Sequence, residues 1–184
     1  TRVVQKVWDG FNSNNGKRRN GGIIGKKSIM ALVDFSRAFD GVWKYGLYHK
    51  MHAMGLPPHM IRWVRGFLHD RNAKVRFGDG MSTYRKMAEG IPQGTVLGPY
   101  LFDIFINDLA LELGDEVDTS LFADDLAIVG QGITVEECEE KVQSALNKLQ
   151  AWAHKWKMTI SFEKTEQLLF SLNVAEVNGK RHPN

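Results

Sequence analysis

Apolar residues recur along the chain at helical spacing in some segments and in short continuous or alternating runs in others. The clearest helical pattern covers residues 134–157, where apolar side chains share one face and Thr134 with Glu137 forms a capping box. Further helices are predicted at the start of the chain, over residues 43–54, after Pro57 and Pro58, and over the strongly apolar residues 99–113. Helices therefore account for much of the predicted order.

Strands are predicted between these helices. Residues 28–35 (SIMALVDF) form a continuous apolar run that ends beside an acid, a pattern typical of a strand covered on both faces. Further strands are predicted over residues 73–77 and 81–88 around a tight turn at 78–80, on either side of Asp124 and Asp125 within 121–130, and over 158–161 and 166–172. Helices and strands are mixed without strict alternation, so we predict an α+β fold with an antiparallel sheet backed by helices.

Composition narrows the class of protein only slightly. The net charge of +3 and the pI near 9.0 suit a nucleic-acid partner and many other proteins as well. A single cysteine, Cys138, excludes an internal disulfide and a cysteine-based zinc site. No run approaches the roughly 18 apolar residues of a membrane span, so we expect no membrane partner and an intracellular protein, cytoplasmic or nuclear.

Basic residues are spread over two stretches of the sequence. Residues 12–27 (NSNNGKRRNGGIIGKK) are rich in asparagine, glycine and cations, which predicts a surface loop. A second scatter of cations follows at Arg62, Arg65, Arg71, Lys74 and Arg76. Such a distribution suits contacts with phosphates, although a solvated surface explains it equally well.

Three acids lie where apolar runs end or break. Asp34 closes the run at 28–35, and Asp124 with Asp125 interrupts the run at 121–130. Carboxylates gathered from a strand end and a neighbouring hairpin are hard oxygen ligands suited to the magnesium ions of phosphoryl transfer. An ordinary hairpin turn, in which aspartate is favoured for backbone reasons, is the alternative for the pair. Their apolar neighbours predict buried acids, compensated by bound cations or by a basic partner.

Four blocks of sequence together carry a resemblance to a known family. ALVDFSRAFDGVW (31–43), GLPPHMIRWVRGFLHDR (55–71), EGIPQGTVLGPYLFDIFINDLA (89–110) and LFADDLAIV (121–129) resemble, in order and spacing, the reverse transcriptases of non-LTR (LINE-like) retrotransposons. The resemblance implies a polymerase palm over residues 28–172, preceded by the end of the fingers and a basic loop over 1–27. Residues 173–184 would be a tail that leads to a thumb in a longer polyprotein.

The resemblance also implies roles for the acids. Asp34 and Asp124 would hold two Mg²⁺ ions, with Asp125 beside them and the backbone carbonyl of Phe35 as a further ligand. Asp40 competes with Asp34 within VDFSRAFD, but it does not directly follow the strand and more naturally supports the next turn. Lys164 resembles the lysine that serves as general acid for the departing pyrophosphate. Here the sequence departs from the family, which commonly has asparagine where this chain has Ser161.

Substrate contacts are implied at three further positions. Phe39 matches the bulky residue that excludes a nucleotide with a 2′-hydroxyl, with core packing as its alternative. Gln93 matches a polar contact to the incoming nucleotide and template, and Gly94 would permit close approach of the backbone.

The activity implied by the resemblance is RNA-directed addition of deoxynucleotides to a primer 3′-hydroxyl by a two-metal mechanism. Its partners would be an RNA template, a DNA primer, deoxynucleoside triphosphates and flanking fingers and thumb segments. For the isolated chain we expect folding without processive synthesis. The alternatives are a catalytically inactive module that binds nucleic acid and an RNA-dependent RNA polymerase. Phe39 and the alanine before the aspartates disfavour the RNA-dependent RNA polymerase.

Overall fold

The structure is a computed structural model that describes residues 2–12, 18–19, 22–23 and 25–172. Residues 13–17, 20–21 and 24 of the predicted loop at 12–27, and all of the tail at 173–184, lie outside these residues. The contacts divide the chain into two compact units. Unit 1 comprises residues 1–35, 109–153 and 160–184, and unit 2 comprises 36–108 and 154–159.

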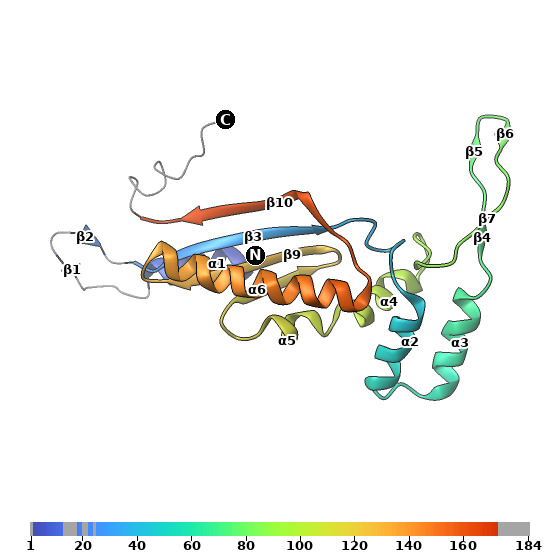
Figure 1. The fold of residues 1–184 in the computed structure, drawn as a ribbon, viewed down its shortest axis with the longest axis horizontal. Helices are drawn as coiled ribbons and strands as arrows, with labels where there is room; N and C mark the ends of the chain where they lie inside the picture. The colour runs from blue at the N-terminus through green and yellow to red at the C-terminus, as the bar shows by residue number, and fades with distance from the viewer. Residues whose placement is uncertain (1, 13–17, 20–21, 24, 173–184) are drawn as a thin grey trace. The chain divides into compact units, whose positions relative to one another are not determined.

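A four-stranded sheet forms the centre of unit 1 (Figure 1). Its order is β10 (Ile160–Phe170), β3 (Lys27–Phe35), β9 (Asp125–Gly132) and β8 (Asp118–Phe122), and every neighbouring pair is antiparallel. Two strands were predicted over 158–161 and 166–172. The structure has one strand there, β10, whose pairing with β3 is irregular between Ser161 and Glu166. The predicted α+β fold with an antiparallel sheet is confirmed.

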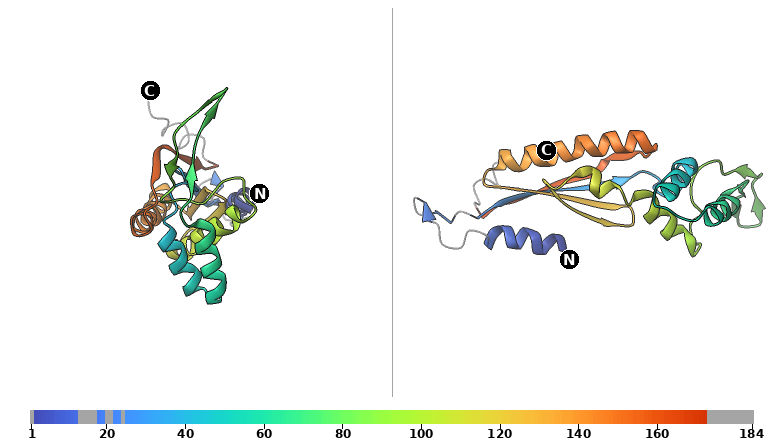
Figure 2. Two further views of the ribbon diagram at one scale, coloured as in Figure 1. Left: turned by 90° about the vertical axis from the view of Figure 1, so that its right-hand side faces the viewer. Right: turned by 90° about the horizontal axis from the view of Figure 1, so that it is seen from below.

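Helices cover the two faces of this sheet unequally. α6 (Val135–Trp156) and α1 (Arg2–Asn12) lie on opposite sides of it (Figure 2). Residues of β3 on the α6 side are buried, among them Ile29, Ala31, Val33 and Phe35, whereas the alternate residues Met30, Leu32 and Asp34 are half-buried. The prediction of a strand covered on both faces is therefore wrong for the second face, where these alternate residues remain half-buried. On that side, α1 contacts the sheet near Gln131, whose side-chain amide donates to the carbonyl of Lys6.

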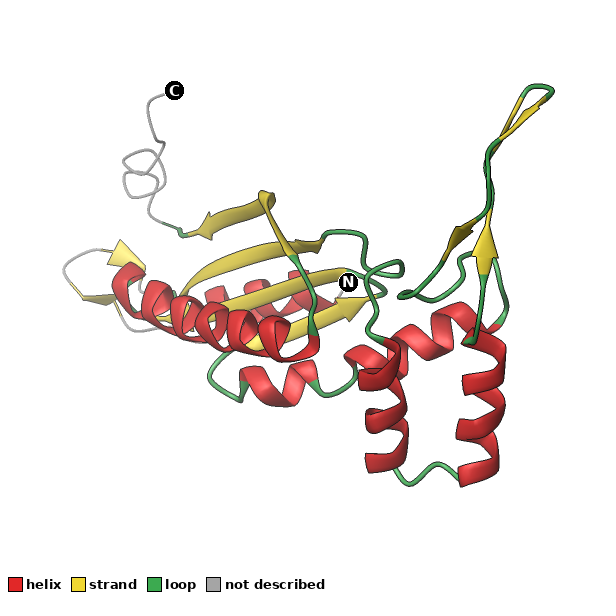
Figure 3. Cartoon of the chain, turned by 45° about the vertical axis from the view of Figure 1, so that its right-hand side comes forward, coloured by secondary structure: helices red, strands yellow, loops and turns green. Residues whose placement is uncertain are grey.

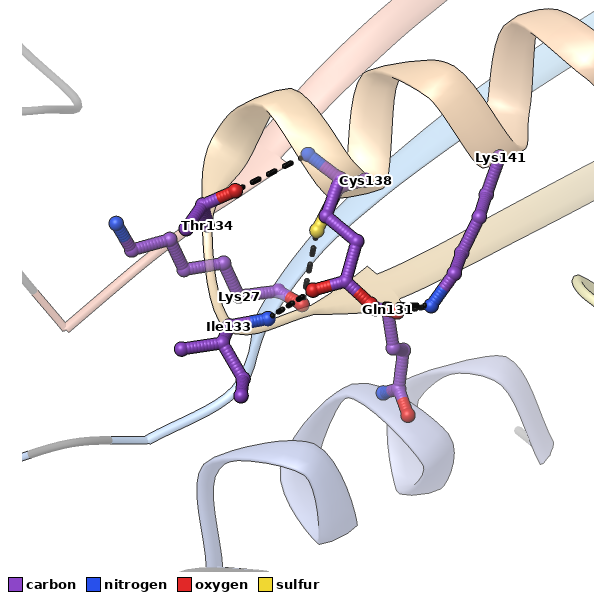
Figure 4. Close-up of polar contacts among 7 residues, drawn as sticks. Lys27, Gln131, Ile133, Thr134, Cys138 and Lys141 are labelled. Carbon is purple, nitrogen blue, oxygen red and sulfur yellow. Dashed lines mark hydrogen bonds and ion pairs between the residues drawn. The ribbon is translucent and has the colours of Figure 1, made fainter.

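The start of α6 is held by the predicted capping box, with a small difference. The Thr134 hydroxyl accepts a hydrogen bond from the Glu137 backbone N–H at 3.1 Å. The Glu137 carboxylate accepts from the Ile133 N–H at 2.9 Å, one residue earlier than in the standard box, and pairs with Lys141 at 2.7 Å. Figure 4 shows Ile133, Thr134 and Lys141 around this corner. The hydrogen bond from Lys141, followed by that from Ile133, lowers the pKa of Glu137.

Unit 2 contains three helices around an apolar core. They are α2 (Lys44–Ala53), α3 (Pro58–Leu68) and α4 (Leu97–Ile106). The largest buried side chains here are Leu47, Met51, Leu68, Leu101, Phe102 and Phe105. The single helix predicted over 99–113 is wrong, because α4 ends at Ile106 and a separate short helix, α5 (Leu109–Leu113), follows in unit 1. At the break, the Asp108 carboxylate accepts a hydrogen bond from the buried ammonium of Lys50 on α2.

A narrow hairpin also belongs to unit 2 and extends away from α2 and α3 (Figure 3). Its stem pairs β4 (Asn72–Ala73) with β7 (Arg85–Lys86), and its tip pairs β5 (Arg76–Phe77) with β6 (Gly80–Met81). The predicted hairpin and its tight turn are confirmed, but each predicted strand is broken into two short pieces. Gly78 in the turn has φ +57°, which favours glycine.

Two features complete the description. β1 (Arg18–Arg19) and β2 (Gly22–Ile23) form a short antiparallel pair. Among the described residues, no helix combines the length and the apolar character needed to cross a membrane.

Candidate active site

The paired aspartates lie at the hairpin between β8 and β9. Phe122 pairs with Asp125, so Ala123 and Asp124 form a two-residue turn. Ala123 has φ +52°, a left-handed conformation in which glycine, asparagine and aspartate are favoured. Because alanine occupies that position while the aspartates follow it, the backbone of the turn does not explain why two aspartates are present here.

Asp34 reaches the same end of the sheet from the neighbouring strand. Val33 pairs with Leu126 in the last step of the antiparallel ladder between β3 and β9. Asp34 follows Val33 and Asp125 precedes Leu126, so both aspartates lie at this end of the ladder. Side chains alternate between the faces of a strand. Val33 and Phe35 are buried on the α6 side, and Phe35 packs against Trp152 with ring centroids 6.2 Å apart. Asp34 therefore faces the opposite side of the sheet, which is the open side.

A cleft of about 350 Å³ lies on this open side. It is lined by Asp34, Asp125, Lys164 and Phe122, together with Leu32, Val33, Ser120, Leu126 and Ala127. Oδ2 of Asp34 is buried and has no hydrogen-bond partner. Its contact is an ion pair with Nζ of Lys164 at 3.3 Å, in which the Asp34 side chain is 27% exposed and that of Lys164 72% exposed. A buried carboxylate oxygen without a hydrogen bond, paired with one largely exposed ammonium, can still coordinate a further cation.

The three acids are less buried than their apolar neighbours predicted. Asp34 and Asp124 are half-buried and Asp125 is exposed, because Phe122 and Ala123 are exposed and only Leu126 and the following residues enter the core. The expectation of buried acids was therefore wrong, and the predicted basic partner exists for Asp34 as Lys164. Within the described part of the chain, no three metal-ligating side chains are gathered closely enough to hold an ion.

These residues nevertheless fit a divalent ion in their chemistry. The donor set consists of carboxylate oxygens, which hard cations such as Mg²⁺ prefer, and one of these oxygens is buried without a hydrogen bond. The Phe35 side chain is buried against Trp152, so only its backbone carbonyl is suited to the predicted role of metal ligand.

The other predicted site residues lie in unit 2. Phe39 is half-buried and stacks on Phe102 with ring centroids 4.6 Å apart, so its alternative role in packing is at least partly realised. The side-chain amide of Gln93 donates to Oδ1 of Asp40 at 3.2 Å. Asp40, which we set aside as a metal ligand, thus links the two sequence blocks that contain Phe39 and Gln93.

A glycine in the same loop was missed by the sequence analysis. Gly90 has φ +86°, and a Cβ atom there would lie 2.6 Å from the carbonyl oxygen of Asp40. Gly94 has φ +74°, but a Cβ atom there would meet nothing within 4 Å. The close approach within this chain therefore occurs at Gly90, while Gly94 is required by its backbone conformation and leaves open space beside it.

Comparison with known proteins shows the family to which the chain belongs. The sequence matches the reverse transcriptase (RNA-dependent DNA polymerase) family over residues 5–181, so the chain belongs to this family. Its relatives include the RNA-directed DNA polymerase from the mobile element jockey of Drosophila melanogaster, 31% identical over 150 residues, and the probable RNA-directed DNA polymerase from transposon BS of the same species, 33% identical over 147 residues. These matches confirm the resemblance to non-LTR retrotransposon enzymes.

The alignments with these two relatives include most of this chain but a small part of each relative. The two alignments cover 78% and 77% of this chain but only 16% of each relative, so the chain spans about one sixth of their length. Among solved structures, apo telomerase from Candida tropicalis, truncated from its C-terminal domain, is similar with a TM-score of 0.63 and 10% identity. That similarity covers 94% of this chain and 35% of the telomerase chain, and it confirms a palm-like fold.

Proposed function

We propose that this chain is the palm portion of an RNA-directed DNA polymerase that adds deoxynucleotides to the 3′-hydroxyl of a primer paired with an RNA template. The observation that carries the proposal is the arrangement at the open end of the sheet in unit 1. There, Asp34 with its buried Oδ2 lies in one cleft with Asp125 and Lys164, next to the turn that holds Asp124. The sequence relatives are named as enzymes of this activity.

The acids are proposed to hold two Mg²⁺ ions. Asp34 and Asp124 would supply the main carboxylate ligands, with Asp125 and the carbonyl of Phe35 as additional oxygen donors. When bound, two such ions neutralise the charge of a triphosphate and favour ionisation of the primer hydroxyl. Within the chain itself, β3 and the β8–β9 turn hold the carboxylates at the end of a hydrogen-bonded sheet. A rigid sheet limits movement of these ligands.

Lys164 is proposed to protonate the departing pyrophosphate. Its side chain is 72% exposed and lines the cleft, so it is accessible to a ligand there. A lysine proton neutralises charge on a leaving oxygen, which is the requirement for a general acid in this reaction. The ion pair with Asp34 must open for this role, and the solvent around the exposed Lys164 screens the pair, which limits its strength to about 1 kcal/mol.

Three residues of unit 2 are assigned to the incoming nucleotide and template on the strength of the family resemblance. Phe39 would exclude a 2′-hydroxyl, Gln93 would supply a polar contact and Gly94 would allow the ligand to approach the backbone. In support, Phe39 is held by stacking on Phe102 and Gln93 is oriented by Asp40. Positioned side chains of this kind give specificity at little cost in side-chain entropy.

The experiment that tests the proposal is the substitution Asp124→Asn in a full-length polymerase that contains this chain. Asparagine keeps the size and the turn but removes the charge that a metal ligand requires, so primer extension on an RNA template should fall by at least about 1,000-fold, a loss of about 4 kcal/mol in transition-state stabilisation. Asp118→Asn is the matched control, because Asp118 lies at the far end of β8 and pairs with Lys6. Extension that survives Asp124→Asn unchanged would refute the assignment.

A catalytically inactive module that binds nucleic acid is the second candidate. The observation that favours it is the ammonium of Lys164 against Oδ2 of Asp34, which is a stable arrangement for a site without metal. Binding of a deoxynucleoside triphosphate measured with and without Mg²⁺ separates the two candidates. Binding that requires Mg²⁺ supports the polymerase, and binding that is indifferent to Mg²⁺ supports the inactive module.

A further inference from the structure

The hairpin of unit 2 carries the whole excess of positive charge of this chain. We define the basic hairpin as residues 71–87, closed by the hydrogen bond from the Met87 N–H to the Arg71 carbonyl. It contains five cations, Arg71, Lys74, Arg76, Arg85 and Lys86, and one acid, Asp79. The rest of the chain contains 19 basic and 20 acidic residues, so the basic hairpin has a net charge of +4 and the remainder is almost neutral.

These cations are available to a partner. Every residue from 72 to 87 is exposed, and Arg71 is half-buried. Among the described residues, Lys86 is the one cation of the basic hairpin that pairs with an acid, at 3.3 Å from Asp70. Five cations with so little internal neutralisation form a local positive field, which attracts polyanions.

Large apolar side chains are interleaved with the cations. Phe77, at the tip, is 90% exposed, and Tyr84, in the stem, is 69% exposed. Lys74 lies over the Tyr84 ring at 5.0 Å from its centroid. Two exposed aromatic rings on so small an element offer apolar surface that a ligand can bury. Aromatic rings placed among cations stack with unpaired bases while the cations contact the phosphates.

The base of the hairpin is fixed to the helical part of unit 2. The buried ammonium of Lys44, on α2, donates to the carbonyl of Leu68 at 3.1 Å and to the carbonyl of Met87 at 2.7 Å. These two carbonyls lie just before and at the end of the hairpin, so one lysine holds both of its strands at the root. Burial lowers the pKa of Lys44. The base of the basic hairpin is therefore fixed to α2, while its tip is exposed to solvent.

We infer that the basic hairpin is a binding surface for single-stranded nucleic acid, with its cations on the phosphates and with Phe77 and Tyr84 stacked on unpaired bases. An acidic polypeptide would satisfy the cations but would leave the two rings without stacking partners. The inference rests on the proposed function for the identity of the nucleic acid, which is the template RNA. The binding surface itself requires neither the carboxylates nor a metal.

The test is binding of a fluorescently labelled single-stranded RNA to the 184-residue chain, followed by anisotropy at several salt concentrations. The triple substitution Lys74→Gln, Arg76→Gln and Arg85→Gln should weaken binding and reduce the slope of log K against log salt by about 2, because each phosphate contact on a single strand contributes about 0.7. Phe77→Ala with Tyr84→Ala should weaken binding about fivefold or more and leave the slope unchanged, since stacking is insensitive to salt.

A second triple substitution controls for general electrostatics. Arg62→Gln, Lys148→Gln and Lys155→Gln also removes three exposed cations, but from α3 and α6. It should leave most of the affinity and the slope intact. The inference is overturned if the two triple variants lose affinity equally, if the hairpin variants bind as the parent does, or if polyglutamate displaces the RNA as effectively as unlabelled RNA.

The proposed polymerase function can fail separately. RNA binding to the 184-residue chain is measured without Mg²⁺ or triphosphate, so this readout does not depend on the proposed catalytic role of Asp124 in the β8–β9 turn. Extension that persists in the full-length Asp124→Asn enzyme would refute the catalytic assignment alone, whereas loss of RNA binding confined to the hairpin variants would still support the inference.

Discussion

At the scale of single residues, Lys164 and Asp34 are the pair most informative about the candidate active site. The ammonium of Lys164 lies 3.3 Å from the one oxygen of Asp34 that is buried without a hydrogen bond. A metal ion at Asp34 would compete for the same oxygen. The lysine therefore has two opposing effects, since it stabilises the chain without metal and supplies the proposed proton to a bound substrate.

Removal of this lysine should make divalent ions bind more tightly. With Lys164→Gln we expect an increase in Mn²⁺ affinity of up to about fivefold, because a solvent-screened ion pair of roughly 0.2–1 kcal/mol no longer competes. Titration of the 184-residue chain by calorimetry, or by the electron paramagnetic resonance signal of free Mn²⁺, measures the change. Lys148→Gln, on α6 and outside the cleft, is the control and should leave the affinity as it is. Weaker binding by Lys164→Gln would show that Lys164 does not compete for Asp34.

At the scale of elements, β9 packs closely against α6 at Gly130. A Cβ atom on Gly130 would lie 2.7 Å from Cγ2 of Val142 and 2.9 Å from the carbonyl oxygen of Cys138. Neither atom belongs to the end of a flexible side chain, since valine has a stiff side chain and the carbonyl is part of the helix. Glycine at this position therefore sets the distance between helix and sheet.

Replacement of this glycine by alanine should be destabilising, although alanine reduces the conformational entropy of the unfolded chain and stabilises a protein where there is space for its Cβ atom. We expect Gly130→Ala to cost about 1–3 kcal/mol through overpacking and to lower the melting temperature by several degrees, as measured by circular dichroism. The same substitution at Gly66 is the control, because it lies in the last turn of α3 and a Cβ atom there would meet nothing within 4 Å. Gly66→Ala should raise stability by about 0.5–1 kcal/mol. Equal effects at both positions would contradict the role of Gly130.

The sequence predicts correctly those elements whose apolar spacing and capping residues lie within the element itself. Residues 134–157 combine one apolar face with the Thr134–Glu137 box, and the structure has α6 at Val135–Trp156. The break between α4 and α5 could not be predicted in this way, because the apolar pattern continues through it. It coincides with the contact of Asp108 with Lys50, a residue 58 positions earlier in the chain.

The same distinction applies to the candidate site. Asp34, Asp124 and Asp125 were identified from their positions at the ends of apolar runs, and the register of the sheet brings Asp34 and Asp125 into one cleft. Their exposure was mispredicted, because neighbouring apolar letters do not reveal which side of a strand is covered. Two tertiary contacts, the hydrogen bond from Gln93 to Asp40 and the approach of Gly90 to Asp40, have no signal in single-sequence spacing.

At the scale of the whole molecule, the division into two units implies two separate cores. Unit 1 is organised around β3, which is hydrogen-bonded to strands on both sides. Unit 2 is organised around Lys50, whose buried ammonium donates to the carbonyl of Phe105 and pairs with Asp108. It also lies 3.9 Å from the centroid of the Trp156 ring. Polar groups in a core of this kind are strongly coupled to the stability of the helices they join.

Lys50→Met should therefore destabilise unit 2 more than unit 1. Methionine preserves the length of the side chain but removes the donor to Phe105 and the charge opposite Asp108, at an expected cost of about 1–3 kcal/mol. Native-state hydrogen exchange should show this loss in amides of α2 and α4, while amides of β3 and β9 keep the protection of the parent chain. Lys155→Met, at an exposed position of α6, is the matched control and should leave both sets unchanged. If β3 and α2 lose protection equally in Lys50→Met, the two units unfold as one, and the two cores contribute to a single cooperative transition.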